Sequence, residues 1–294
     1  MRRKSWTIKD LLEVTGNYLR EKGIESPRLS AEVLLAFQLK FDRVGLYLNF
    51  DKPLNEREVA AYRELIKRRL NREPLQYMTG IQEFWSLDFA VGPQVLIPRP
   101  ETELLVEQVV SLRDDKILTK GIDLRILDLG TGCGVLAVSL AREFERASVW
   151  ASDVSAEALA IAKMNAKKHG VEDRIEFLLG DMWQGMIDLS LVFDVIVSNP
   201  PYIASDHISS LPPEVRDHEP RSALDGGEQG MHFIKEIIKE APKYLDTGGW
   251  VLLEMDPEQT AIAMELMDKN NDYMEKRRIK DHSGCYRVVM AQKR

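Results

Sequence analysis

The chain has 294 residues, of which 44% are hydrophobic and 30% charged, as is usual for a soluble globular protein of about two domains. Its two cysteines, Cys133 and Cys285, form no Cys-x-x-Cys pair, which argues against a disulfide framework or a structural zinc site and fits a reducing cytoplasm. The net charge of −7 offers no broad basic surface to nucleic acid, although the first 80 residues carry a mild basic excess. No run reaches the roughly 18 apolar residues of a membrane helix, and no apolar signal segment follows the basic start.

The first part of the chain, residues 1–79, has apolar residues at helical spacing. Ser26 and Pro27 fit an N-cap followed by proline at the first helical position. Asn55 is placed to cap a further helix over residues 56–70. We therefore expect a small helical bundle that carries no chemistry of its own.

Residues 80–98 have a different character. Phe84, Trp85 and Phe89 belong to a short stretch that is rich in strand-forming residues. A turn signal follows at Pro93, which comes directly after a glycine. This pattern predicts a β-hairpin that links two domains.

The remaining residues, 99–294, alternate strands with helices after an opening helix at 104–112. The apolar runs 124–129 and 192–198 are interpreted as buried strands, and a helix is expected at 135–144. The alternation continues to a final pair of strands near the end of the chain. Such alternation predicts an α/β fold with a parallel sheet that helices cover on both faces.

A glycine-rich stretch from Asp128 to Gly134 lies between a predicted strand and a helix. Glycines permit a tight turn and the close approach of a ligand, and a helix N-terminus attracts electron-rich groups. The segment from Gly132 to Ala137 also fits the dinucleotide pattern Gly-x-Gly-x-x-Ala, which is a weak signal by itself. Asp153, about 20 residues further on, suits a pair of ribose hydroxyls with either ligand. Asp128 would repel a pyrophosphate but suits a cationic ligand.

The glycine stretch resembles the motif of Rossmann-like S-adenosylmethionine-dependent methyltransferases, in which an acidic residue precedes Gly-x-Gly-x-Gly. The resemblance implies S-adenosylmethionine as the cofactor and no metal. It also implies that Asp181 faces the adenine, and it leaves open whether Met182 or Trp183 covers the ring. The cofactor-binding residues implied in this way are Asp128, Gly130, Thr131, Gly132, Cys133, Gly134, Asp153, Asp181, Met182, Trp183 and Asn199.

The segment SNPPYI, from Ser198 to Ile203, ends an apolar strand with an asparagine and two prolines. Proline gives no hydrogen bond to a sheet, so a rigid loop is expected at the carboxyl end of the strand, where α/β sheets bind ligands. The segment resembles the [D/N]-P-P-[Y/F/W] loop of methyltransferases that modify planar nitrogens. Asn199 Oδ1 and the Pro200 carbonyl are expected to accept the two N–H groups of such a nitrogen, and Tyr202 to lie against it. These three residues are the candidate catalytic residues.

The loop alone does not separate three acceptors: an adenine amine or a guanine amine in nucleic acid, or a glutamine amide in a protein. Further stretches help to choose among these acceptors. They are residues 73–80, Phe84 with Trp85, 96–103, 128–134, 199–203, 218–220 with 223–227, and Arg287, and the most specific is Ile-Pro-Arg-Pro-Glu-Thr-Glu at 97–103. In these stretches, and so over nearly its whole length, the sequence resembles the release-factor glutamine methyltransferases, known as the HemK family. A nucleic-acid amino methyltransferase and a binding module that keeps its cofactor pocket only for stability are the alternatives.

The family resemblance implies a helical release-factor-docking domain at 1–79, a β-hairpin linker at 80–98 and a methyltransferase domain at 99–294. In that third domain it implies a mostly parallel seven-stranded sheet with an antiparallel C-terminal strand. The implied reaction is methylation of N5 of the glutamine in the Gly-Gly-Gln motif of peptide chain release factors, which modulates translation termination. We expect a cytoplasmic monomer that binds neither nucleic acid nor membranes. The expected substrate-binding residues are Asn199, Pro200, Pro201, Tyr202, Arg99 and Glu101.

Overall fold

The computed structural model describes residues 6–114, 123–186 and 191–294. These residues form two compact units. The first unit contains the described residues up to Ile81 together with Pro212–His218, and the second contains the others. One boundary therefore falls inside the predicted linker, whereas the membership of Pro212–His218 in the first unit has no counterpart in the sequence analysis. The functions assigned above to the predicted domains stay predictions.

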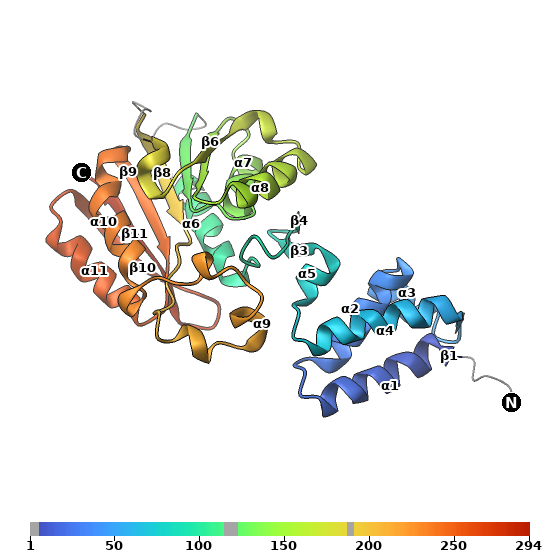
Figure 1. The fold of residues 1–294 in the computed structure, drawn as a ribbon. Coiled ribbons are helices and arrows are strands. Elements are labelled where there is room, and N and C mark those ends of the chain that lie inside the picture. The colour runs from blue at the N-terminus through green and yellow to red at the C-terminus, as the bar shows by residue number, and fades with distance from the viewer. Residues whose placement is uncertain (1–5, 115–122, 187–190) are drawn as a thin grey trace, which may run out of the picture. The chain divides into compact units, whose positions relative to one another are not determined.

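The first unit is mainly helical (Figure 1). Its helices are α1 (Ile8–Glu21), α2 (Pro27–Leu39), α3 (Arg43–Leu48), α4 (Glu56–Leu70) and α5 (Leu75–Thr79), with α9 (Pro213–Arg216) from the later segment, and β1 (Trp6–Thr7) pairs antiparallel with β2 (Pro53–Leu54). Asn55 and Glu58 form a capping box at the start of α4, which confirms the predicted cap and helix there. Ser26 precedes α2 as expected, but its φ of 46° is left-handed and its side chain accepts no capping hydrogen bond from a described residue.

The strands β3 (Ile81–Phe84) and β4 (Leu87–Ala90) form a two-stranded hairpin, as the strand-rich pattern predicts. Trp85 and Ser86 form its turn with φ values of 51° and 56°. Positive φ at both turn residues matches the right-handed twist of the flanking strands. Phe84 and Phe89 are buried and meet edge to face, with ring centroids 6.1 Å apart. This aromatic contact stabilises the hairpin from its buried side.

The second unit is built on a sheet that has seven strands among the described residues. In spatial order they are β10 (Tyr273–Lys280), β11 (Tyr286–Lys293), β9 (Leu245–Glu254), β8 (Phe193–Ser198), β5 (Arg125–Leu129), β6 (Ser148–Asp153) and β7 (Ile175–Leu179). Neighbouring strands pair in parallel except for β11, which runs antiparallel to both β10 and β9. The predicted α/β sheet with an antiparallel C-terminal strand is thereby confirmed.

Helices pack on both faces of this sheet (Figure 1). Alternate strand residues such as Leu127, Ile196 and Leu253 belong to one buried cluster with α10 (His232–Tyr244) and α11 (Gln259–Lys269). The opposite face contacts α6 (Glu103–Asp114), α7 (Val135–Glu143) and α8 (Ala156–Lys168). Side chains of successive strand residues point to opposite faces, so both faces require apolar cover.

The order in which the chain visits the strands of the sheet indicates where the candidate site lies. From the central strand β5 the chain proceeds to β6 and β7 on one side, and it later returns to β8 and β9 on the other. Ligands of open α/β sheets bind beyond the carboxyl ends of the strands where the order reverses in this way. Short 3-10 helices occupy Pro100–Thr102, Glu172–Arg174, Met182–Met186, Ile208–Ser210, Arg221–Ala223 and Glu228–Gly230.

Candidate active site

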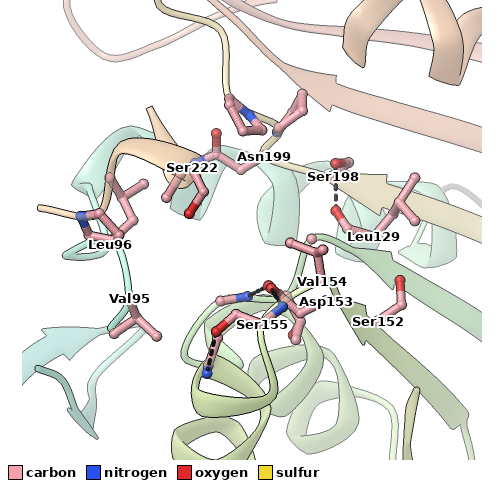
Figure 2. A pocket seen from close by; sticks show the side chains of 18 of the residues that line it. Val95, Leu96, Leu129, Ser152, Asp153, Val154, Ser155, Ser198, Asn199 and Ser222 are labelled. Atoms are coloured by element: carbon pink, nitrogen blue, oxygen red, sulfur yellow. Dashed lines mark hydrogen bonds between the residues drawn. The ribbon is translucent and has the colours of Figure 1, made fainter. Parts of the chain in front are cut away.

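A cavity of about 430 Å³ opens at the carboxyl ends of β5, β6 and β8. Figure 2 shows Asp153 and Asn199 on opposite sides of this space, with Val95 and Leu96 on a third side. The cavity therefore brings together the glycine loop, the end of β6, the loop after β8 and the segment after the hairpin. Two sites predicted from separate stretches of sequence thus share one cavity.

The glycine loop forms one wall of the cavity, which Gly130, Thr131, Gly132 and Cys133 line. The N–H groups of Gly130 and Thr131 both donate to the Ser152 carbonyl, at 2.9 and 2.8 Å. This pair of hydrogen bonds ties the loop to the end of β6. Gly132 has a φ of 56°, and a Cβ atom built there would meet no described atom within 4 Å. The absence of a side chain at this position leaves backbone open to the cavity.

Gly134 lies where the start of α7 packs against α8. It lies outside the cavity lining, and its φ is 87°. A Cβ atom at this position would lie 3.0 Å from the Cβ atom of Ala162 on α8. Glycine is required here because two helices approach closely. The cofactor contact predicted for Gly134 stays a prediction.

Asp128 is also placed differently from the prediction. It is fully buried and does not line the cavity. Its Oδ2 atom accepts hydrogen bonds from the Thr131 hydroxyl at 2.6 Å and from the Ala137 N–H at 3.0 Å. Burial raises the pKa of Asp128 to about 7, against the opposing effect of these two hydrogen bonds. The carboxyl group therefore organises the loop and the start of α7 from behind.

Asp153 meets the expectation of a carboxylate on the cavity wall. Its Oδ2 atom accepts a hydrogen bond from the Gly132 N–H, and its Oδ1 atom accepts one from the Ser155 N–H, both at 2.9 Å. Burial raises its pKa, while these backbone hydrogen bonds oppose that shift. The backbone thus fixes the direction of the carboxylate and leaves its remaining acceptor capacity for a ligand.

The stretch after β7 separates into a cavity side and a core side. Asp181 and Met182 line the cavity. Trp183 is only 7% exposed, and its ring stacks on Tyr244 with centroids 4.6 Å apart and planes 4° from parallel. The two residues that the sequence could not tell apart are therefore distinguished, because Trp183 belongs to the core and only Met182 faces the cavity.

Asn199 is held at both its backbone and its side chain. The hydroxyl of the preceding Ser198 donates to the Leu129 carbonyl at 2.6 Å, which fastens the end of β8 to β5 (Figure 2). The Asn199 Nδ2 atom donates to the Thr102 hydroxyl at 2.9 Å. Asn199 also lines the cavity together with Pro200 and Pro201. A planar amide that presents its nitrogen to Thr102 directs its oxygen to the other side.

The backbone after the prolines is also fixed. Gln259 Nε2 donates to the Tyr202 carbonyl at 2.8 Å, and the Ile203 N–H donates to the Leu224 carbonyl at 3.0 Å. A Cβ atom at Gly226 would lie 2.6 Å from the Pro201 carbonyl oxygen, so only glycine fits there. These contacts give the predicted loop rigidity a physical basis beyond its prolines.

Tyr202 lies beside the cavity lining, along a neighbouring groove. Its hydroxyl donates to Glu254 Oε1 at 3.2 Å. Burial, followed by the nearby Glu254 charge, raises the pKa of Tyr202 above its ordinary value, so the phenol stays protonated at neutral pH. The predicted contact of Tyr202 with the acceptor stays a prediction.

Arg99 and Glu101 lie outside the lining of the cavity, and their predicted role in binding the substrate stays a prediction. Arg99 pairs with the buried Glu219 at 2.5 Å, and Glu219 also accepts the Ile97 N–H at 3.1 Å. Glu101 is exposed. Arg99 therefore joins the segment before Pro98 to the segment after Glu219, and both of these segments contribute to the cavity wall.

Sequence reasoning missed Thr102, Glu219, Glu254 and Gln259 as supports of the site. Thr102 and Glu219 fall inside stretches that carried the family resemblance, which was the available signal. Glu254 and Gln259 lie outside those stretches, so residue type and spacing gave no signal for them. Each acts through partners that are distant in sequence, as the separation of 97 residues between Asn199 and Thr102 illustrates.

Within the described ranges, no group of three or more His, Cys, Asp or Glu side chains could hold a metal ion. Among the same residues, every helix is too short or too polar to cross a membrane.

Family models match both parts of the chain. The model described as PrmC N-terminal domain matches residues 10–80, and the model described as methyltransferase small domain matches residues 102–211. Among solved structures, the hMettl16 catalytic domain in complex with MAT2A 3'UTR hairpin 1 shares a TM-score of 0.57 at 16% identity over 76% of this chain and 79% of that one. A methyltransferase from Pyrococcus furiosus shares a TM-score of 0.50 at 22% identity, over 71% and 90%. At these identities the likeness shows the fold alone.

Curated relatives match over nearly the full length. A release factor glutamine methyltransferase from Geobacter sulfurreducens is 43% identical over 97% of this chain and 96% of its own. A protein of the same name from Koribacter versatilis is 40% identical over 98% and 99%. Identity at this level, together with the glycine loop and the Asn-Pro-Pro-Tyr loop on one cavity, shows that the chain belongs to the release factor glutamine methyltransferase family.

Proposed function

We propose that this protein transfers a methyl group from S-adenosylmethionine to the side-chain nitrogen N5 of the glutamine in the Gly-Gly-Gln motif of peptide chain release factors, and thereby modulates translation termination. The observation that carries the proposal is the position of Asn199, whose amide nitrogen is occupied by Thr102 on a cavity that Asp153 and the glycine loop also line. The names and full-length similarity of the relatives support the choice of acceptor.

The cavity residues fit S-adenosylmethionine. Gly130 and Gly132 present backbone without side chains, and a Cβ atom at either would meet no described atom within 4 Å, which leaves room for a ligand against the loop. Asp153 offers a fixed carboxylate to ribose hydroxyls, and Asp181 and Met182 offer an acceptor and an apolar cover to the adenine. When bound, the cofactor supplies a methyl group on a positively charged sulfur.

The acceptor amide is a poor nucleophile because its nitrogen lone pair is delocalised into the carbonyl group. Asn199 Oδ1 and the Pro200 carbonyl accept its two N–H groups and aim the lone pair across the cavity. The prolines and Gln259 keep these acceptors in place, so little reorganisation accompanies the reaction. As the new N–C bond forms, the bond between the methyl carbon and sulfur would break; the nitrogen becomes acidic, and one of its two protons is released to water.

The remaining parts of the chain serve recognition. Residues 1–79 dock the release factor, residues 80–98 form the linker, and residues 99–294 carry out the transfer. The match of residues 10–80 to a domain model of this family supports the first assignment. Pro201 and Tyr202 complete the acceptor site, while Arg99 maintains its wall through Glu219. We propose that the protein works as a cytoplasmic monomer, without a metal and without binding nucleic acid.

Mass spectrometry of a purified release factor after incubation with this protein and S-adenosylmethionine tests the proposal. We expect a gain of one methyl group on the Gly-Gly-Gln glutamine. A release factor with that glutamine replaced by alanine serves as the control and stays unmodified. An unmodified wild-type release factor, with labelled RNA or DNA in a parallel reaction, would identify a nucleic-acid amino methyltransferase instead.

A further inference from the structure

One buried amide side chain connects the Asn-Pro-Pro-Tyr loop to two other segments. Gln259, the first residue of α11, is 7% exposed and lies outside the cavity lining. Its Nε2 atom donates to the carbonyl oxygens of Tyr202 at 2.8 Å and of Gln229 at 3.0 Å. Its Oε1 atom accepts the Asp256 N–H at 3.0 Å. Three backbone segments that are distant in sequence therefore meet at one side chain.

The partners of Gln259 determine which way its amide faces. A backbone N–H only donates and a backbone carbonyl only accepts, so Oε1 faces Asp256 and Nε2 faces the two carbonyls. An amide can serve all three because it carries two N–H donors and an acceptor on one planar group. A carboxylate could serve only the N–H, and an apolar side chain none of the three. The residue type at this position therefore matches its partners.

The turn at 227–230 leaves room for this amide. Gly230 has a φ of 67°, and a Cβ atom there would collide with both the Tyr202 carbonyl oxygen and Gln259 Nε2. Gln229 has a φ of 54°, which is unfavourable for a residue with a side chain. Such a conformation persists only where the surrounding contacts hold it. The hydrogen bond from Gln259 to the Gln229 carbonyl is one of these contacts, so the amide and the turn depend on each other.

The segment before this turn also holds the Asn-Pro-Pro-Tyr loop. The Ile203 N–H donates to the Leu224 carbonyl at 3.0 Å, and the Gly226 N–H donates to the Ile203 carbonyl at 2.8 Å. The hydrogen bond from Gln259 engages Tyr202, the residue directly before Ile203. Gln259 thus binds the loop directly and also binds the turn that follows the segment packed along it.

We propose that Gln259 joins the Asn-Pro-Pro-Tyr loop, the turn at 227–230 and the end of β9 into one rigid unit, and that it acts in this way as a positioning residue for methyl transfer. Its catalytic value rests on the proposed function, in which Asn199 and Pro200 accept the N–H groups of the substrate amide and Tyr202 lies against it. A displacement of the reacting groups by about 1 Å can cost about 100-fold in rate, so a loop that loses this support transfers methyl groups more slowly.

Gln259→Met keeps the length of the side chain and loses all three hydrogen bonds. With saturating substrates we expect kcat to fall about 10-fold or more, while Kd for S-adenosylmethionine by calorimetry stays within about two-fold. Gln292→Met is the matched control, because Gln292 Nε2 also donates to a backbone carbonyl, that of Gly248 at 2.9 Å, and neither residue lines the cavity. The control should keep kcat within about two-fold. Equal losses of kcat in both variants, or a loss of cofactor affinity as large as the loss of kcat, would overturn the proposal.

Gln259→Glu adds a readout that simple damage to the fold would not give. The introduced carboxyl group can donate one hydrogen bond and accept the Asp256 N–H while it is protonated, but it only accepts once it is ionised. We therefore expect the ratio of kcat in Gln259→Glu to kcat in Gln259→Met to fall about three-fold or more as the pH rises. The titratable side chains of the neighbouring groove occur in both variants, so their effects cancel: Tyr202, Asp206, His207, Glu228, Asp256 and Glu258. A ratio that does not vary with pH would contradict the proposal.

A measurement without methyl transfer distinguishes failure of this inference from failure of the proposed function. Hydrogen exchange of the resting protein, followed by mass spectrometry on peptides that cover residues 199–205, reports how readily the loop opens. We expect exchange there to be about 10-fold faster in Gln259→Met than in the wild type, and unchanged in Gln292→Met. Unchanged exchange in Gln259→Met would refute the role of Gln259 whether or not release factors are substrates. Faster exchange, in a protein whose wild type methylates no release factor, would instead count against the proposed function alone.

Discussion

Asn199 joins two opposite hydrogen-bonding ends in one planar group. Its nitrogen donates to the Thr102 hydroxyl, and the proposed function assigns its oxygen to the acceptor. We expect Asn199→Ala to lower kcat by about 100-fold or more, since misplacement of a reacting group alone costs about that much. Kd for S-adenosylmethionine should stay within about three-fold. Methyl transfer to the release factor and calorimetry with the cofactor measure the two quantities.

The matched control for this variant is Asn271→Ala, at an exposed residue of the second unit. It should leave both quantities unchanged. A loss of cofactor binding in Asn199→Ala comparable to its loss of kcat would mean that the loop holds the cofactor and not the acceptor.

The burial of Glu254 leads to a prediction about how the stability of the fold depends on pH. Burial raises the pKa of Glu254 to about 7, so the folded state binds its proton more tightly than the unfolded state does. The stability that this proton contributes is present below pH 4.5 and is lost as the pH rises through about 7. Glu254→Gln does not titrate, so its Tm should improve relative to the wild type as the pH rises. We expect the difference in Tm to grow by about 5–10 °C between pH 5 and pH 8.

Thermal unfolding of both proteins without ligand measures this difference. Asp128 titrates in the same range in both proteins, so its contribution cancels. A difference in Tm that does not vary with pH would place the ionisation of Glu254 outside this window.

At the scale of elements, the 3-10 helix Met182–Met186 divides its side chains between cavity and core. Trp183→Ala removes a ring that stacks on Tyr244 and should destabilise the protein by about 3–5 kcal/mol, with little effect on cofactor affinity of the folded fraction. Met182→Ala should behave in the opposite way and raise Kd for S-adenosylmethionine about 10-fold through lost apolar cover. Denaturant unfolding measures the stability of both variants, and calorimetry measures their Kd for S-adenosylmethionine. If Met182→Ala lost stability and Trp183→Ala lost cofactor affinity, the assignment of Met182 to the cavity and Trp183 to the core would be wrong.

The contact of α7 with α8 gives a second prediction at this scale. Gly134→Ala places a methyl group 3.0 Å from the Cβ atom of Ala162 at a φ of 87°, whereas Gly170→Ala meets no described atom within 4 Å at a φ of 67°. Both variants carry the cost of a left-handed residue, about 1–2 kcal/mol. Only Gly134→Ala adds overpacking, about 1–3 kcal/mol. Denaturant unfolding should therefore rank Gly134→Ala as the less stable, and equal losses would mean that α8 moves aside at no cost.

Local patterns predicted the elements of this chain well. The apolar run at 192–198 became β8, and the Asn55 cap with the helix at 56–70 was found as expected. Ser26 shows the limit, because the helix starts there without the side-chain cap that its residue type suggested. The sequence predicts a strand at 250–255, but β9 begins five residues earlier at Leu245, because pairing with β8 extends there across a bulge.

The site could be predicted only as far as its local motifs extend. Residue type and spacing are enough to predict Asn199, Asp153 and the glycine loop as parts of the site. The partners that orient them do not, because the contact of Asn199 with Thr102 spans 97 residues and that of Tyr202 with Glu254 spans 52. Nor does spacing reveal depth: Asp128 and Gly134 belong to the motif and yet support the loop from behind.

At the scale of the whole molecule, the two units have separate cores and different charge. The first has its own buried cluster, which includes Leu34, Leu35 and Tyr62. It also takes in Pro212–His218, where Glu214 pairs with Arg69 at 3.0 Å. A unit with its own core, a mild basic excess and no part of the cavity is suited to bind a protein substrate without affecting the chemistry.

The last prediction tests this division of labour. Arg57 and Arg63 are exposed on α4, and their joint replacement by glutamate should raise KM for the release factor about 10-fold. At saturation kcat should stay unchanged, because the groups that hold the acceptor amide are untouched. Lys239 and Lys269, exposed in the second unit, provide the control: their joint replacement by glutamate changes the net charge equally and should leave KM as it was. An equal rise of KM in both double variants would show that overall charge attracts the release factor; a fall of kcat in the Arg57 and Arg63 variant would show that the first unit also shapes the catalytic site.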